Sequence, residues 1–438
     1  MASLQGTLRW TSVINLMLKG VAVLVALVNQ IILARCMSPH DFGTYVIVVA
    51  WVSFLSVVGG WGMPLAAVRF LPQYRHFDNF PAVRGFFWDS ACVSLLGSTI
   101  IMVGFVTICT WVGDLFESAA AGAPLLLLIC LFTLATGLLQ AMRQPLRAEI
   151  LGNIVRPVAI GLLVGGYAWL VELPNSAHAL LLTCIATAVA LAPAMLIAIR
   201  SLPGSIAGQR DTTERRAWLA SGFAFLLPMA AMSLIERLDI ILLGTLVGAA
   251  DAGTYQVASR LAQMVGLAMV SVNALLGPMA AELIGRKDQQ GLQRLLANGA
   301  VLNCALAAIV ALVLIVAGPR ILLLFGPNFV AAGPAMEILA FGHVVQAGLG
   351  AAGGILALAG RNKVIIVAML VAVCLHPLLC VLLIPALGLT GAALATALTT
   401  ATLALALTCI AANILKVDTS LRAGILLGAA RWRHIFSR

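Results

Sequence analysis

The chain has 438 residues, of which 62% are hydrophobic and 10% charged, and its mean hydropathy is +1.07. Soluble domains carry roughly 25% charged residues, so this composition excludes a water-soluble globule. The apolar runs reach about 20 residues or more, which predicts membrane-spanning helices rather than the short alternating strands of a barrel.

Twelve spans are predicted in chain order. They lie at 10–34, 42–66, 86–111, 122–142, 151–171, 178–199, 217–247, 252–278, 295–318, 331–358, 364–385 and 389–414. If the N-terminus is cytoplasmic, the segments on its side hold 21 of the 26 lysines and arginines, Arg156 among them. The positive-inside rule then places both termini in the cytoplasm. The net charge of +10 is thereby explained without nucleic acid.

A short stretch near the N-terminus recurs 210 residues later. Asp41-Phe42-Gly43-Thr44-Tyr45 aligns with Asp251-Ala252-Gly253-Thr254-Tyr255, and each copy joins two apolar helices. We interpret Asp41, Gly43 and Tyr45, and their counterparts Asp251, Gly253 and Tyr255, as structural residues of a repeated turn. The repeat predicts two pseudo-equivalent halves. The expected domains are a six-helix bundle at 1–200, a cytoplasmic linker at 201–216, a second bundle at 217–414 and an interfacial tail at 415–438.

Few charges fall within the predicted spans, and each is a functional candidate because a charge in the bilayer is costly. Lys19, Arg237 and Arg260 would give a basic interior that suits an anionic headgroup. The carboxylates Glu236, Asp239 and Glu337 would exchange protons or sodium. The lone histidines His343 and His376 are interpreted as packing residues.

Asp239 and Arg260 lie at equal depth on the hairpin of the seventh and eighth spans, so they could form an ion pair. Such a pair either locks the hairpin or lines a cavity and changes partner during transport. The repeat places Asn29 and Ala50 at the equivalent positions of the first half. Since the first hairpin forms without these charges, the functional interpretation is slightly favoured.

Motifs for other activities are missing from the sequence. It contains no G-x-x-x-x-G-K-[ST], H-E-x-x-H or G-x-S-x-G string. The nine cysteines lie mostly in apolar runs, with no C-x-x-C, which favours packing over disulfides or metal binding. We therefore expect a transporter rather than an enzyme, with no metal and no cofactor.

Several stretches resemble one family. Residues 228–264, PMAAMSLIERLDIILLGTLVGAADAGTYQVASRLAQM, resemble the seventh and eighth helices of Wzx-type polysaccharide flippases. These belong to the multidrug/oligosaccharidyl-lipid/polysaccharide exporter superfamily. Residues 33–45, 321–342 and 360–399 agree with the same family.

The resemblance implies an all-α polytopic membrane protein with two pseudo-symmetric six-helix bundles around a central cationic cavity. It also implies alternating access, coupled to protons or sodium, in the bacterial inner membrane. The implied substrate is an undecaprenyl-pyrophosphate-linked oligosaccharide, which moves to the outer leaflet for lipopolysaccharide or exopolysaccharide synthesis. Implied partners are a polysaccharide polymerase and a chain-length regulator, and a monomer is expected. Two alternatives stay open: a cation-coupled multidrug exporter and an integral-membrane glycosyl polymerase.

Overall fold

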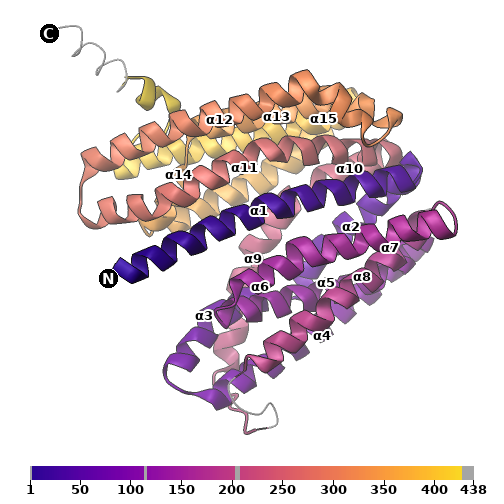
Figure 1. Ribbon diagram of the computed structural model, residues 1–438, viewed down its shortest axis with the longest axis horizontal. Helices are drawn as coiled ribbons and strands as arrows, with labels where there is room; N and C mark the ends of the chain where they lie inside the picture. The colour runs from indigo at the N-terminus through magenta and orange to yellow at the C-terminus, as the bar shows by residue number, and fades with distance from the viewer. Residues whose placement is uncertain (1, 113–115, 203–207, 427–438) are drawn as a thin grey trace. The chain divides into compact units, whose positions relative to one another are not determined.

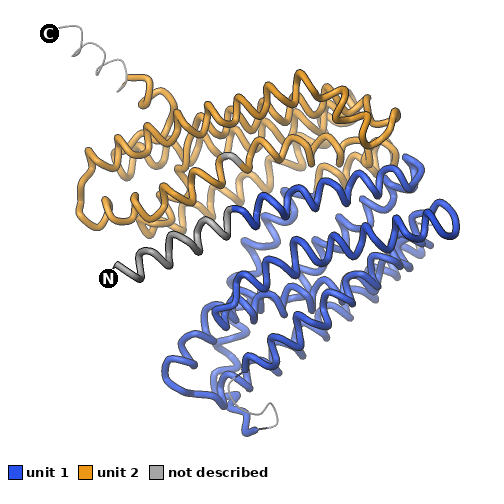
Figure 2. Tube along the Cα trace, in the orientation of Figure 1, with its two compact units in different colours: residues 1–237 blue, residues 238–438 orange. Residues whose placement is uncertain are grey.

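The computed structural model describes residues 2–112, 116–202 and 208–426. Within these ranges every regular element is helical, as expected for apolar segments that must satisfy their own backbone hydrogen bonds in a bilayer. The chain forms two compact units, residues 1–237 and residues 238–438 (Figure 2). We describe each unit by itself.

Unit 1 consists of nine helices and one π-helical turn among its described residues (Figure 1). They are α1 (Ala2–Cys36), α2 (Pro39–Gly59), α3 (Met63–His76), α4 (Phe80–Val112), α5 (Phe116–Ala141), α6 (Pro145–Ile150), η1 (Leu151–Val155), α7 (Arg156–Leu170), α8 (Ser176–Arg200) and α9 (Arg215–Ile235). Helix α5 is central, because α2, α3, α4 and α8 all pack against it.

Unit 2 is built in the same way from long apolar helices (Figure 1). Its elements are α10 (Leu238–Leu246), α11 (Ala249–Gly285), α12 (Gln289–Leu323), the 3-10 turn η2 (Pro327–Ala332), α13 (Gly333–Leu349), α14 (Ala352–Leu358) and α15 (Asn362–Leu415). Helices α11, α12 and α13 pack against one another, and α13 also packs along α15.

The described residues contain eleven helices long and apolar enough to cross a membrane. One of them, α15, has 54 residues. At 1.5 Å per residue it would be roughly 80 Å long if straight, well over twice the thickness of a hydrocarbon core. Its helical path is interrupted at Gly388 (φ 57°, ψ −128°), between the spans predicted at 364–385 and 389–414. The prediction of about twelve membrane-spanning helices is therefore confirmed.

The boundary between the compact units lies at Arg237, later in the chain than the predicted linker at 201–216. Helix α9, the seventh span, packs against α2 and α3 within unit 1. The described part of the linker is tied to the start of α4, since the Asp211 amide donates to the Pro81 carbonyl at 3.0 Å. The division into bundles at 1–200 and 217–414 stays a prediction.

An aromatic cluster holds α9 onto α3 and α4. Trp218 is 1% exposed and packs edge-on against Phe86, with ring centroids 5.4 Å apart. Its Nε1 donates to the Tyr74 hydroxyl at 2.7 Å, and that hydroxyl donates to the Glu214 carboxylate. Burial, followed by the hydrogen bond to Glu214, raises the pKa of Tyr74 to about 12. The tyrosine therefore remains a donor at every physiological pH.

We expect Tyr74→Phe to destabilise unit 1 by about 1–3 kcal/mol, because the buried Trp218 Nε1 loses its acceptor. A tyrosine with a raised folded pKa stabilises fully below its unfolded pKa of about 10 and loses this contribution as the pH rises through about 12. Thermal unfolding in detergent should therefore show a deficit that is constant from pH 6 to 9. A deficit that disappears within that range would contradict the assignment.

The described part of the C-terminal tail packs on unit 2. The Asp418 backbone amide and carbonyl pair with the side-chain amide of Gln293 on α12, each at 2.7 Å. Val417 and Thr419 are buried. Residues 427–438, where Arg431 to Arg433 were expected at a membrane interface, lie outside the described residues.

Candidate functional site

The repeated segment begins a helix in both units. In unit 1, Ser38 caps α2 by accepting from the Asp41 amide at 3.1 Å. Asp41 Oδ1 accepts from the Ser176 amide at the start of α8, at 3.2 Å. Asp41, Gly43 and Tyr45 thus lie in the first two turns of α2 rather than in the connection itself. Asp251, Gly253 and Tyr255 lie correspondingly at the start of α11.

The tyrosine of each copy bonds a threonine on a later membrane-spanning helix of its own unit. Tyr45 and Thr183 on α8 are joined by a 3.1 Å hydroxyl contact. Tyr255 and Thr396 on α15 are joined by another of 3.1 Å. The repeat is therefore kept in tertiary contacts as well as in sequence.

Asp239 adds a buried carboxylate to this contact in unit 2. It is 3% exposed and lies in the first turn of α10. Its Oδ2 accepts from the Tyr255 hydroxyl at 2.7 Å and from the Thr396 hydroxyl at 3.1 Å, while its Oδ1 accepts from the Ile240 amide at 2.8 Å. Among the described residues, two hydroxyls and one backbone amide therefore hold the carboxylate.

The ion pair predicted between Asp239 and Arg260 does not account for these contacts. The Arg260 guanidinium instead donates to Gln263, one turn further along α11, at 3.3 Å. Equal depth on a hairpin does not fix the direction in which two side chains point around their helices. Asp239 is turned toward Tyr255 and α15, so hydroxyls replace the expected cation.

His376 completes the buried polar group of unit 2. Its Nδ1 lies 3.2 Å from the Thr399 hydroxyl, its Nε2 lies 3.8 Å from Cys380 Sγ, and it interacts electrostatically with Asp239. The sequence interpretation as a packing residue is incomplete, because His376 belongs to the polar environment of the one buried carboxylate among the candidates.

The other predicted charges differ from Asp239 in their exposure. Glu337 on α13 is exposed, and so is Glu236, in the turn that separates α9 from α10. Lys19 on α1 is also exposed, whereas Arg237 is half-buried. Of the three carboxylates predicted to bind ions, only Asp239 lies in an enclosed polar environment.

Arg156 is the residue that the sequence reasoning missed. The positive-inside count assigns it to a cytoplasmic segment although it falls within the span predicted at 151–171. The structure places it inside the membrane-spanning run Pro145–Leu170, directly after the π-helical turn η1. Its Nε is buried without a hydrogen-bond partner among the described residues, and its guanidinium lies 5.8 Å from the Phe132 ring centroid. Tyr45 and Arg237 lie within electrostatic range of it. Unit 1 therefore holds two cations within electrostatic range of each other, and π-bulges often mark functional sites.

The two units thus carry related polar groups of opposite charge. In unit 1 a guanidinium lies near the Tyr45–Thr183 contact, and Asn29 takes the repeat position of Asp239. The Asn29 Oδ1 is buried without a hydrogen-bond partner among the described residues. Unit 1 can attract an anion, whereas the carboxylate of unit 2 can hold a proton or a small cation.

Comparisons with known proteins identify the family. A family model described as "Polysaccharide biosynthesis protein" matches residues 10–283, more than half of the chain. The chain belongs to the polysaccharide biosynthesis protein family. A second model, MatE, matches residues 224–382. The match to the MatE model covers most of unit 2, and the resemblance predicted from residues 228–264 is confirmed.

One curated relative of this family member is the succinoglycan biosynthesis transport protein ExoT of Rhizobium meliloti (strain 1021). The two are 24% identical over 327 residues, which are 70% of this chain and 60% of ExoT. The match thus spans less than two thirds of the relative's length.

Solved structures show the fold of this family member. The lipid II flippase MurJ, in an inward closed conformation, superposes with a TM-score of 0.70 at 14% identity, covering 93% of this chain and 89% of MurJ. The MATE multidrug transporter DinF-BH in complex with R6G gives 0.63 at 18% identity, covering 93% and 95%. The chain is therefore a multi-pass membrane protein with the two-lobed, all-helical fold of these transporters.

Proposed function

We propose that the protein flips an undecaprenyl-pyrophosphate-linked oligosaccharide from the inner to the outer leaflet of the bacterial inner membrane, for surface or exopolysaccharide synthesis. The observation that carries this proposal is the polysaccharide biosynthesis family match over residues 10–283. The ExoT name, which concerns succinoglycan transport, and the lipid II flippase fold support a lipid-linked sugar as the substrate.

The charged groups fit such a substrate. Arg156 and Arg237 are neighbouring cations in unit 1, and guanidinium groups bind phosphate oxygens in bidentate geometry. We propose that they receive the pyrophosphate, with Lys19 and Arg260 as further cationic contacts. The excess of positive charge attracts a dianionic headgroup and gives no affinity for a cationic one.

Coupling to an ion gradient is assigned to Asp239. Its carboxylate takes up a proton or sodium ion, and Tyr255 and Thr396 hold it in place. Binding of the ion neutralises the carboxylate and weakens its hydrogen bonds with both hydroxyls. The contact between α10, α11 and α15 is altered as a result. Glu236 and Glu337 are exposed, so we propose at most a transient role for them as entry or release groups.

The proposed membrane orientation and partners follow from the proposed flippase function. Both termini lie in the cytoplasm, because most lysines and arginines fall on that side of the predicted spans. A polymerase and a chain-length regulator would use the flipped product, and the transporter acts as a monomer. No cofactor besides the coupling ion is required.

A cation-coupled multidrug exporter is the second candidate, favoured by the MatE match over residues 224–382. Deleting the gene separates the two candidates. The flippase proposal expects loss of a surface or secreted polysaccharide, accumulation of its lipid-linked precursor, and unchanged sensitivity to cationic drugs. Normal polysaccharide with increased drug sensitivity would establish the exporter instead. Chain extension by the purified protein would establish a glycosyl polymerase.

A further inference from the structure

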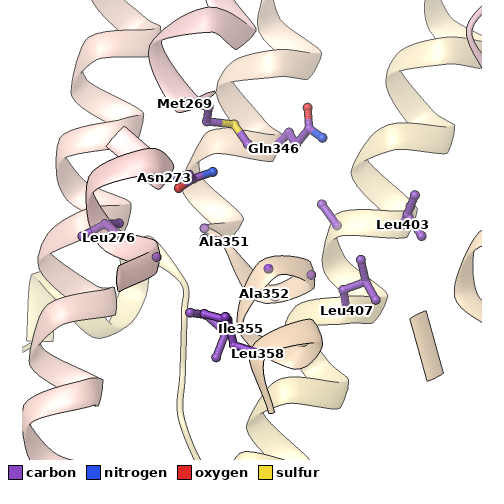
Figure 3. Close-up of a pocket in the computed structure, with 15 residues that line it drawn as sticks. Met269, Asn273, Leu276, Gln346, Ala351, Ala352, Ile355, Leu358, Leu403 and Leu407 are labelled. Carbon is purple, nitrogen blue, oxygen red and sulfur yellow. The ribbon is translucent and has the colours of Figure 1, made fainter. Parts of the chain in front are cut away.

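Unit 2 contains an open pocket of about 470 Å³ lined by α11, α13, α14 and α15 (Figure 3). Its volume lies within the range of about 300–1,000 Å³ that is typical of small-molecule sites. The walls are aliphatic side chains and glycines, with Met269, Leu276, Ile355, Leu403 and Leu407 among them. None of the lining residues is charged.

The break between α13 and α14 forms one wall of this cavity. Gly350 has φ +80°, and a Cβ atom there would lie 2.1 Å from the Thr419 carbonyl oxygen, so no other residue fits. The Leu349 carbonyl, freed by the break, accepts from the hydroxyls of Thr408 and Thr419 at 3.0 Å each. Because α15 and the tail cap the break in this way, the cavity is a built part of the fold.

Two side-chain amides give the cavity a polar end (Figure 3). The Asn273 Oδ1 accepts from the buried Asn303 at 3.1 Å, and the Gln346 Oε1 lies 3.4 Å from the His343 Nδ1. Both amide oxygens are thus engaged within the protein. The two NH₂ groups remain as donors for a ligand that carries hydrogen-bond acceptors.

The chemistry of the lining selects the ligand. A sugar would leave several hydroxyls without partners against aliphatic walls, which is costly. A phosphate would find no cation among the lining residues. A hydrocarbon chain fits the walls, and a neutral acceptor such as an ester carbonyl fits the two NH₂ donors.

We propose that this cavity binds one acyl chain of a bilayer glycerophospholipid, with the ester carbonyl accepting hydrogen bonds from Asn273 and Gln346. The pocket shares no lining residue with the Asp239 network or with the cations assigned to the substrate. It makes a membrane lipid a structural ligand of unit 2, inserted beside the break in the tenth span. This proposal does not depend on the identity of the transported molecule.

Two glycines allow the cavity to be filled without disturbing its walls. An added Cβ at Gly277 on α11 or Gly354 on α14 would meet no atom within 4 Å. Gly277→Leu and Gly354→Leu should therefore occupy the space intended for the lipid while the helices stay intact. Gly104→Leu on α4 is the matched control, because Gly104 has equally open surroundings but lies in unit 1.

Native mass spectrometry of the full-length protein in detergent, titrated with palmitoyl-oleoyl phosphatidylglycerol, tests the proposal. Wild type and Gly104→Leu should bind one lipid, and both filled variants should bind it at least tenfold more weakly. Thermal unfolding without added lipid confirms that the filled variants are folded. Equal binding by all four proteins would overturn the proposal.

The polar end is tested with an ether-linked phosphatidylglycerol, which has no ester carbonyl. Wild type should prefer the ester lipid, and Asn273→Leu should lose that preference while still binding both lipids. Equal wild-type binding of the two lipids would refute the role of the amides. Displacement of phosphatidylglycerol from wild type by equimolar undecaprenyl phosphate would overturn the assignment to a bilayer lipid, and it would leave the proposed transport function untouched.

Discussion

Asp239→Asn is expected to abolish gradient-driven transport while leaving unit 2 folded. The substitution keeps the size of the side chain but removes the negative charge that binds the coupling ion. Tyr255, Thr396 and the Ile240 amide all donate to this carboxylate. An asparagine NH₂ group cannot accept from any of them. If it takes the place of Oδ1, the Ile240 amide loses its acceptor, and if it takes the place of Oδ2, both hydroxyls lose theirs.

The substitution should change transport much more than it changes the free energy of unfolding. Hydrogen bonds to a charged group contribute about 1.5–3 kcal/mol each, and removing a buried charge offsets part of their loss. We therefore expect the free energy of unfolding to change by less than about 3 kcal/mol. Polysaccharide export in a complemented deletion strain should fall at least tenfold.

Two further variants make this test specific. Glu282→Gln changes an exposed carboxylate on α11, paired with Arg286 at 2.5 Å, and should leave export unchanged. Tyr255→Phe keeps the carboxylate and removes its 2.7 Å donor, so its export should be intermediate. If Asp239→Asn exports as well as wild type, ion coupling must lie elsewhere.

The spans could be predicted from the sequence because they depend on composition along the chain. The lengths of the apolar segments located all twelve spans, including the two spans that are joined in α15, where Gly388 marks the boundary. The repeat at a spacing of 210 likewise predicted equivalent helix starts, and the matching Tyr45–Thr183 and Tyr255–Thr396 contacts agree with it.

The partners of Asp239 could not be predicted in the same way. Thr396 lies 157 residues away along the chain, and its contact with Asp239 depends on how α15 packs beside α10. The hairpin supplied a nearer partner, Arg260, but only by depth and not by direction around the helix. The tenth span also contains a break at Gly350, stabilised by the distant Thr419, that local pattern could not show.

Arg156 illustrates a different limit. The difference in basic residues between the two sides of the membrane becomes larger when a charge near a helix end is assigned to the cytoplasmic loop. The positive-inside rule therefore favoured a cytoplasmic position for Arg156. Arg156 nevertheless falls within the span predicted at 151–171. The structure starts this helical run earlier, at Pro145, and continues it through η1, which places Arg156 well inside the span.

Arg156→Gln is expected to reduce polysaccharide export at least tenfold and, at the same time, to leave the protein as stable as wild type or more stable. A charge in the bilayer is retained against its cost only where function requires it. Among the described residues the Arg156 Nε has no hydrogen-bond partner, so the substitution removes a half-buried cation that is incompletely compensated. Its stacking on Phe132 contributes only about 0.5–2 kcal/mol in return.

Opposite changes in activity and stability distinguish a binding residue from a structural one. A structural Arg156 would give loss of export together with a lower unfolding temperature, and that pattern would refute the proposed contact with the pyrophosphate. Arg147→Gln on α6 is the matched control, because Arg147 is exposed and bonded to Gln144 at 2.9 Å. Arg156→Lys keeps the charge but loses the planar, bidentate group, so its export should lie between that of wild type and Arg156→Gln. Full export by the lysine variant would show that charge alone suffices at this position.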